Sequence, residues 1–148
     1  MHPIELETYL HTFIPLTKAM QVSVLSIEPD SLVLGAPLKP NINPHQTVFG
    51  GSVATLATLS AWSLLHSRLV SEGLQATLVI RRSSLEYERP IKTDFTARAY
   101  MSSVQQGEEF VETFKQQGKA RIEILSEVAC EGQCGVRFKG EFVVLKAH

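Results

Sequence analysis

Cysteine is scarce in this sequence. Cys130 and Cys134 are the only two in 148 residues, and neither a Cys-x-x-Cys pair nor a histidine cluster with metal-ligand spacing accompanies them. This excludes a zinc-ribbon module and a disulfide-rich scaffold. Three residues separate the two cysteines, so a hairpin could place them opposite each other. They are then either a redox pair or two reduced, half-buried thiols.

An excess of positive charge is also missing. Fourteen Lys and Arg residues stand against fifteen Asp and Glu, a net charge of −1, whereas generic nucleic-acid binders carry a basic excess. The N-terminus has acidic Glu5 and Glu7 and no basic region before an apolar run, unlike a secretory signal. We therefore expect a cytoplasmic protein that binds no nucleic acid.

One long stretch, residues 48–67, contains no charged residue and could span a bilayer by its length alone. Hydroxyl side chains interrupt it, among them Ser52, Thr55, Thr58, Ser60 and Ser63. A helix buried within a protein explains this composition better than a membrane span.

The chain length fits a single domain, residues 1–148. Apolar residues at helical spacing predict a helix over residues 1–15, and apolar runs around a Pro-Asp turn predict a hairpin of strands 22–28 and 31–36. Three prolines and two asparagines then exclude regular structure over residues 37–47. A long, weakly polar helix follows over residues 50–72.

After this helix the apolar period changes to two. Leu78 and Ile80 share one parity and Leu85 and Tyr87 the other, which predicts a bulge between them. Three further alternating segments predict antiparallel strands with one covered face, and a short helix is expected over residues 107–118. The fold class is α+β, with one antiparallel sheet around the long helix. Because such a sheet leaves edges unpaired, we expect a dimer.

This element order is that of the hotdog fold, and particular residues strengthen the resemblance. The segment from Asn43 to Gly50-Gly51 resembles the asparagine–loop–glycine-glycine segment that opens the central helix of hotdog acyl-CoA thioesterases. Phe49 stands where the phenylacetate-type enzymes have a histidine. Residues 85–90 and 94–99 resemble the third and fourth strands of the family. Over roughly residues 20–146 the chain is most similar to the thioesterase domain found at the C-terminus of some bacterial acetyltransferase-labelled proteins (the YiiD C-terminal type).

The resemblance implies a thioesterase that acts on an acyl-CoA or acyl-carrier-protein thioester, without a cofactor or metal. It implies a homodimer, or a tetramer of two dimers, with the site at the dimer interface. A module that binds or senses acyl-CoA without cleaving it is the alternative. A hotdog dehydratase ranks last, because it needs a histidine and a carboxylate at the site.

A helix N-terminus suits this chemistry, because its unpaired N–H groups carry partial positive charge. Glycine lets a substrate carbonyl come close to the backbone. The N–H groups of Gly51 and Ser52 are therefore our candidates for stabilising the oxyanion, with Gly50 beside them. The alternative is that the two glycines only permit a tight turn into the helix.

The expected carboxylate on the central helix is absent. In phenylacetate-type enzymes it lies nine residues after the histidine position, which is Thr58 here. Asn43 with Thr58, and Asn41 beside them, would then have to hold the water, which predicts slow turnover. His45 is either a base or a solvated loop residue.

Glu86 and Glu88 are the nearest carboxylates along the predicted third strand, or simply exposed strand residues. Thr55 and Trp62 are candidates for contact with a bound chain, although Trp62 also suits the core. Arg81 and Arg82 are either a clamp for coenzyme A phosphates or a solvated strand face.

Overall fold

The computed structural model describes residues 1–147 and consists of helices packed on one sheet. The helices are α1 (Pro3–Phe13), α2 (Pro15–Ala19), the 3-10 turn η1 (Lys39–Asn41), α3 (Gly50–Ser71) and α4 (Val104–Gln117). The strands are β1 (Ser23–Ile27), β2 (Ser31–Ala36), β3 (Ala76–Tyr87), β4 (Phe95–Tyr100), β5 (Lys119–Cys130) and β6 (Gln133–Lys146). Among residues 1–147, no helix is both long and apolar enough to cross a membrane.

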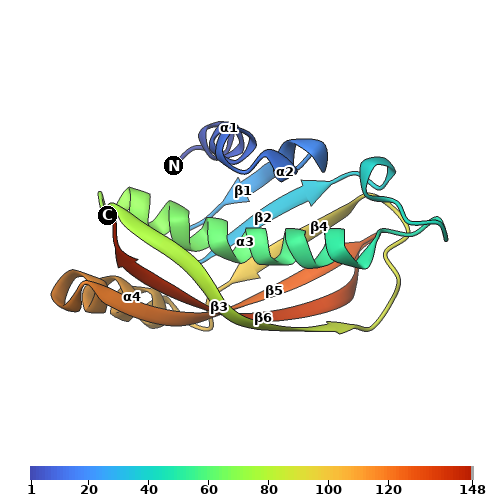
Figure 1. The fold of residues 1–148 in the computed structure, drawn as a ribbon. Coiled ribbons are helices and arrows are strands. Elements are labelled where there is room, and N and C mark those ends of the chain that lie inside the picture. Colours follow the sequence, from blue (N-terminus) through green and yellow to red (C-terminus); the bar gives the residue numbers. More distant parts are fainter. Residues whose placement is uncertain (148) are drawn as a thin grey trace.

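The strands form one antiparallel sheet in the order β1-β2-β4-β5-β6-β3. The sheet curves around α3, as Figure 1 shows, so the α+β hotdog architecture expected from the sequence is confirmed. β3 lies at one edge and pairs only with β6, which leaves its other edge open in the described chain. The predicted bulge lies between Ile80 and Arg82. It turns Ile80 and Leu85 toward the same face as Phe142 and Phe138, their partners on β6.

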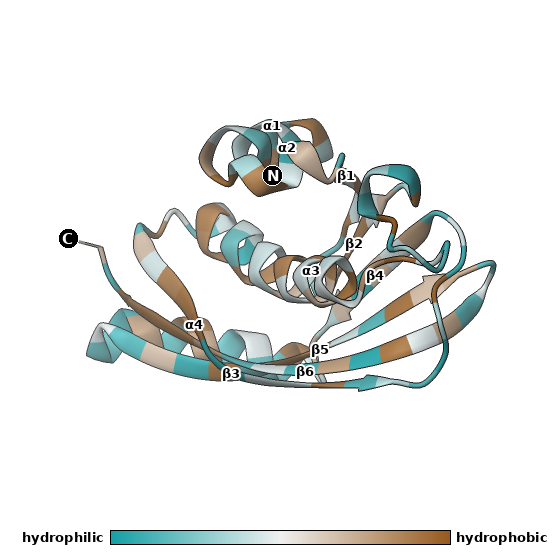
Figure 2. Ribbon diagram, turned by 45° about the vertical axis from the view of Figure 1, so that its right-hand side comes forward, coloured by the Kyte–Doolittle hydropathy of each residue, from teal (hydrophilic) through white to brown (hydrophobic). Residues whose placement is uncertain are grey.

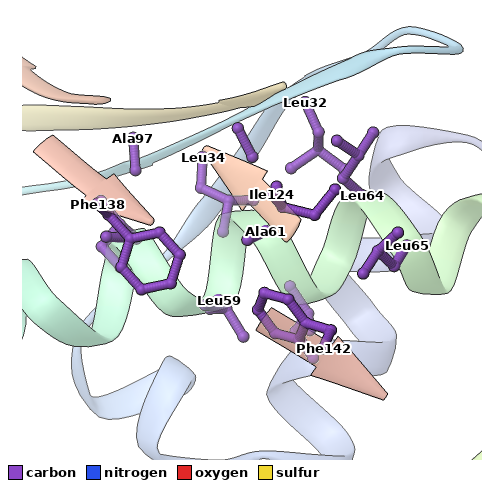
Figure 3. Packing of buried hydrophobic residues seen from close by; sticks show 14 of the residues in the cluster. Leu32, Leu34, Leu59, Ala61, Leu64, Leu65, Ala97, Ile124, Phe138 and Phe142 are labelled. Carbon is purple, nitrogen blue, oxygen red and sulfur yellow. The ribbon is translucent and has the colours of Figure 1, made fainter. Parts of the chain in front are cut away.

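The core lies between α3 and the concave face of the sheet. Small residues on α3 allow close packing, and Ser60 forms a buried 2.9 Å hydrogen bond with Ser126 of β5. Figure 3 shows Leu59, Ala61 and Leu64 of α3 among apolar side chains of the strands. Gly73, with a φ of 70°, ends the helical segment just beyond α3.

The N-terminal segment differs from the single helix expected over residues 1–15. It consists of α1 and α2, because Ile14 leaves the helical conformation (φ −126°, ψ 80°) and Pro15 starts a new helix. Figure 2 shows both helices over α3, on the side away from the sheet. Leu6 and Leu10 of α1 are fully buried there.

The inserted helix α4 begins at Val104, not at residue 107 as expected. Ser103 caps it by accepting a hydrogen bond from the Gln106 N–H at 3.1 Å. Gly107, which looks like a helix breaker in the sequence, lies inside α4. A Cβ atom at this position would lie only 2.7 Å from the sulfur of Met101. The Gln106 side chain donates to the Glu123 carbonyl at 3.2 Å, on a part of β5 that β4 does not pair with.

Candidate active site

The first turn of α3 carries two unpaired N–H groups. The Phe49 N–H donates to the Asn41 carbonyl at 2.8 Å, and the Ser52 N–H donates to the Phe49 carbonyl at 2.9 Å. The N–H groups of Gly50 and Gly51 have no acceptor among residues 1–147. Of the two expected oxyanion donors, Gly51 therefore has a free N–H, while that of Ser52 belongs to the first turn.

The Phe49 side chain packs over Gly51. Phe49 is 59% exposed, and its ring leaves no space for a side chain at Gly51, because a Cβ there would lie 3.0 Å from the Cζ atom of Phe49. Gly51 is itself exposed, so the backbone at this point is open to a ligand from outside. Phe49 stands at the position where the phenylacetate-type thioesterases, which this segment resembles, have a histidine. The apolar ring of Phe49 cannot transfer a proton.

Asn43 organises the loop that leads into α3. Its Oδ1 accepts from the N–H groups of His45 at 2.8 Å and Thr47 at 3.2 Å, and its Nδ2 donates to the Thr47 hydroxyl at 2.8 Å. Its backbone N–H donates to the Thr47 carbonyl at 2.8 Å. Gln46 completes the turn with a φ of 66°. Asn43 as the holder of a catalytic water stays a prediction; these contacts assign it to the loop.

Asn41 and His45 do not line the groove described below. Asn41 is buried, and its side-chain amide donates to the carbonyls of Met20 at 3.0 Å and Pro37 at 2.8 Å. Its Oδ1 is buried without a hydrogen-bond partner among the described residues. Asn41 thus fixes the backbone that receives Phe49, whereas the His45 side chain lies exposed in the loop.

A groove with a volume of about 360 Å³ runs between α3 and β3. Polar side chains line it at three positions, and the other lining residues are apolar. The polar residues are Thr55, Thr58 and Ser83. The apolar residues are Ile14, Ala54, Leu59, Trp62, Ile80, Leu85 and Phe142. Its size lies at the lower end of the range for small-molecule sites, roughly 300–1,000 Å³.

Two hydrogen bonds from side chains to carbonyl groups join α3 and β3 near the ends of this groove. The Tyr87 hydroxyl donates to the Gly50 carbonyl at 3.3 Å, near the start of α3. The Trp62 Nε1–H donates to the Leu78 carbonyl at 2.9 Å, three turns further along the helix. β3 therefore runs antiparallel to α3, and the groove lies between these two contacts.

The threonine hydroxyls have free lone pairs but no free hydrogen. Thr55 donates to the Gly51 carbonyl and Thr58 donates to the Ala54 carbonyl, each at 2.8 Å. Each oxygen can therefore still accept a hydrogen bond from a water. Thr58 lies seven positions after Gly51, about 10 Å along the helix axis, so a single water cannot contact both in one chain.

No carboxylate or histidine lines the groove formed by the described residues. Glu88 is ion-paired with Arg137 at 2.8 Å, and Glu86 lies opposite Arg137 in the register of β3 and β6. Arg81 donates to Glu141 at 2.8 Å, and this hydrogen bond holds the pKa of Glu141 below its usual value. Arg82 lies opposite Glu141 in the register.

Both arginines thus lie near Glu141 on the outer face, and the expected phosphate clamp stays a prediction.

Several functional residues were not found from the sequence. Ile80, Ser83 and Leu85 line the groove, and Tyr87 contacts Gly50. The change of parity along β3 was the signal, because it shows which residues face α3.

His66 is a second feature that the sequence did not reveal. Its ring stacks between Trp62 and Tyr9, with centroid distances of 4.8 Å and 4.5 Å. Its Nε2 is buried without a partner in the described chain, and burial lowers the pKa of this imidazole. The stack connects α1 to the face of α3 that carries Trp62.

Residues 4–146 match the model of a protein family described as "Putative thioesterase (yiiD_Cterm)". Among solved structures, the chain is similar to a protein of unknown function from Chlorobaculum tepidum, with 27% identity, a TM-score of 0.91 and coverage of 98% of this chain and 94% of that one. A putative thioesterase from Shewanella oneidensis shares 26% identity at a TM-score of 0.86, covering 97% and 96%. Mouse thioesterase superfamily member 2 shares 14% identity at a TM-score of 0.70, covering 94% of both chains, a likeness of fold alone.

Proposed function

The chain belongs to this thioesterase family, and we propose that it hydrolyses acyl thioesters of coenzyme A or of an acyl carrier protein. The observation that carries the proposal is the free N–H of Gly51 at the start of α3, with an apolar groove along the same helix. Gly51 lies one turn before Thr55 on the same side of α3, so the donor and the groove are in line.

The reaction requires polarisation of the thioester carbonyl and attack by water. The Gly51 N–H, with the partial positive charge of the helix N-terminus, stabilises the oxyanion that forms on the carbonyl oxygen. Attack of water forms a bond to the carbonyl carbon and the carbon–sulfur bond breaks; the thiolate takes up the proton that the water loses, and the products are the carboxylic acid and the free thiol. Since no carboxylate lines the groove in the described chain, the water is held by threonine oxygens and turnover is slow.

We propose further that the site is completed in a homodimer. One edge of the twelve-residue strand β3 has no pairing strand in the described chain, and a second copy can pair with its free backbone groups. The 10 Å gap supports this arrangement, because the reaction needs a water-holding group nearer to Gly51 than Thr58 of the same chain, and the partner's Thr58 would supply it.

Two substitutions at one position test the oxyanion donor. Gly51→Pro removes the N–H, and proline is tolerated in the first turn of a helix. Gly51→Ala keeps the N–H but displaces Phe49 in the same way, so it is the matched control. Free-thiol release from acyl-CoA and acyl-carrier-protein substrates should have a kcat roughly 10²- to 10³-fold lower in the proline variant than in the alanine variant. Equal rates in folded variants would refute the role of Gly51.

The missing carboxylate supports a second candidate, a module that binds acyl-CoA without cleaving it. Titration calorimetry with acyl-CoA separates the two functions. Micromolar binding without thiol release from any substrate would favour the binding module. Thiol release that depends on the Gly51 N–H would favour the hydrolase.

A further inference from the structure

The groove between α3 and β3 is closed at one end by Trp62. Its indole Nε1–H donates to the Leu78 carbonyl on β3, so the ring spans the gap between the helix and the strand. The ring cannot easily swing back along α3, because His66 stacks against it at an interplanar angle of 11° and Tyr9 stacks against His66. A chain that enters from the Gly51 end therefore stops at Trp62.

The chemistry of the groove changes along its length. The hydroxyl-bearing residues of α3, Thr55 and Thr58, lie on the Gly51 side, while the Trp62 end is lined by Leu59, Ile80 and other apolar residues. At the far end the indole N–H of Trp62 is already donated to the Leu78 carbonyl, which leaves the Ser83 hydroxyl as the one polar lining group besides the two threonines. This mostly apolar lining favours an unsubstituted aliphatic chain over a hydroxylated acyl group.

We propose that this groove binds straight aliphatic acyl chains of about five to ten carbons and that Trp62 sets the upper limit; the inference rests on the proposed function. From Ala54 to Trp62, eight residues along the helix span about 12 Å. An extended alkyl chain with bonds of about 1.5 Å advances roughly 1.25 Å per carbon, so this length holds about ten carbons. In the proposed dimer the thioester carbonyl would lie at Thr58, so a shorter stretch of groove would hold the chain. The four positions from Thr58 to Trp62 span about 6 Å, which gives a lower limit of roughly five carbons.

The chain-length profile tests this inference. Each carbon that fits should raise kcat/KM or affinity by about fourfold, and carbons beyond the limit should give no gain or a loss. We would measure thiol release from straight-chain acyl-CoA esters of two to sixteen carbons, with benzoyl-CoA and phenylacetyl-CoA beside them. An optimum of six to ten carbons is expected. An optimum at two carbons, at twelve or more, or with an aryl group would overturn the inference.

Three variants locate the limit. Trp62→Leu should move the optimum toward longer chains by at least two carbons, because it removes the ring that bridges to Leu78. Ile80→Phe adds bulk inside the groove at a residue that is 39% exposed and should move the optimum toward shorter chains. Val79→Phe is the matched control, since Val79 is the exposed neighbour that faces the other side of the sheet and should leave the profile unchanged. If Ile80→Phe does not shift the profile, or Val79→Phe shifts it equally, the assignment is wrong, whether or not Trp62→Leu folds.

A second measurement separates this inference from the proposed hydrolysis. S-alkyl-CoA thioethers lack the carbonyl and cannot be hydrolysed, so calorimetry with them reports the groove alone. An optimum of six to ten carbons in binding, without thiol release from any ester, would overturn hydrolysis and support the chain-length inference. Thiol release from the esters, with no length preference in either measurement, would support hydrolysis and overturn the chain-length inference.

Discussion

Asn43 offers a sharp test of whether a conspicuous polar residue acts in the chemistry or in the loop. Three side-chain hydrogen bonds hold it to His45 and Thr47, at 2.8, 2.8 and 3.2 Å. A hydrogen bond contributes about 0.5–1.5 kcal/mol net, and one of the three lies at the exposed surface, so Asn43→Ala should lower the free energy of unfolding by about 1–3 kcal/mol. For a domain of this size the melting temperature should then fall by roughly 2–12 °C.

Thr47→Val provides the matched perturbation. It breaks the bond between Asn43 Nδ2 and the Thr47 hydroxyl from the other end while leaving the Asn43 side chain in place. If Asn43 acts by holding the loop, Thr47→Val should reproduce part of both the stability loss and the activity loss of Asn43→Ala. Thermal unfolding followed by circular dichroism and thiol release on the same samples would measure both. A large loss of kcat in Asn43→Ala at unchanged stability, with Thr47→Val fully active, would refute the loop assignment and restore the water-holding role.

Three further outcomes are expected. Thr58→Asp places a carboxylate on the wall of the groove and should raise kcat at least tenfold, toward the factor of about 10²–10⁴ that a well-placed general base contributes. Thiol release measures this change, and an unchanged or lower kcat would count against a missing base. Separately purified Gly51→Pro and Thr58→Val chains, once mixed and refolded, should recover about a quarter of the wild-type thiol-release activity. Half of the random dimers are mixed, and each mixed dimer has one intact site of two. No recovery would place the site within one chain. Burial holds the pKa of His66 below the ordinary value for histidine, so the unfolded chain takes up a proton at a higher pH than the native chain does. The free energy of unfolding should therefore fall as the pH falls from about 7 toward the native pKa. His66→Phe should flatten this pH dependence in denaturation experiments, and parallel profiles of the two proteins would contradict the buried stack.

The elements of the fold were predictable because their signals are local. The period of two in β3 and its change of parity predicted a bulge near Arg81 to Ser84, and it lies at the start of that range, between Ile80 and Arg82. The uncharged run after Gly50 was enough to predict α3. The start of α4 was missed because Gly107 was interpreted as a boundary. In the structure, Gly107 packs closely against Met101, and no local sequence pattern indicates this packing.

The site was less predictable because it depends on contacts between distant segments. The sequence identified Gly51 and Ser52 as equal donors, yet the path of the backbone at Phe49 decides that only one of the two N–H groups is free. The groove combines residues of α3 with residues of β3 that lie eighteen or more positions later. Only the hydrogen bond from Trp62 to the Leu78 carbonyl shows where this groove ends.

The arrangement separates two requirements of thioester hydrolysis. Stabilising the oxyanion depends on backbone N–H groups, and in the proposed reaction the free N–H of Gly51 would supply this whatever side chains surround it. Activating the water depends on a side chain, and the positions where related enzymes carry a histidine and a carboxylate are Phe49 and Thr58 here. An oxyanion donor contributes a factor of about 10²–10³ to the rate and a base about 10²–10⁴, so an enzyme that keeps the first and lacks the second would be slow, not inert. A rate that falls in Gly51→Pro, rises in Thr58→Asp and changes by the product of the two factors in the double variant would show that the two contributions are independent in this chain.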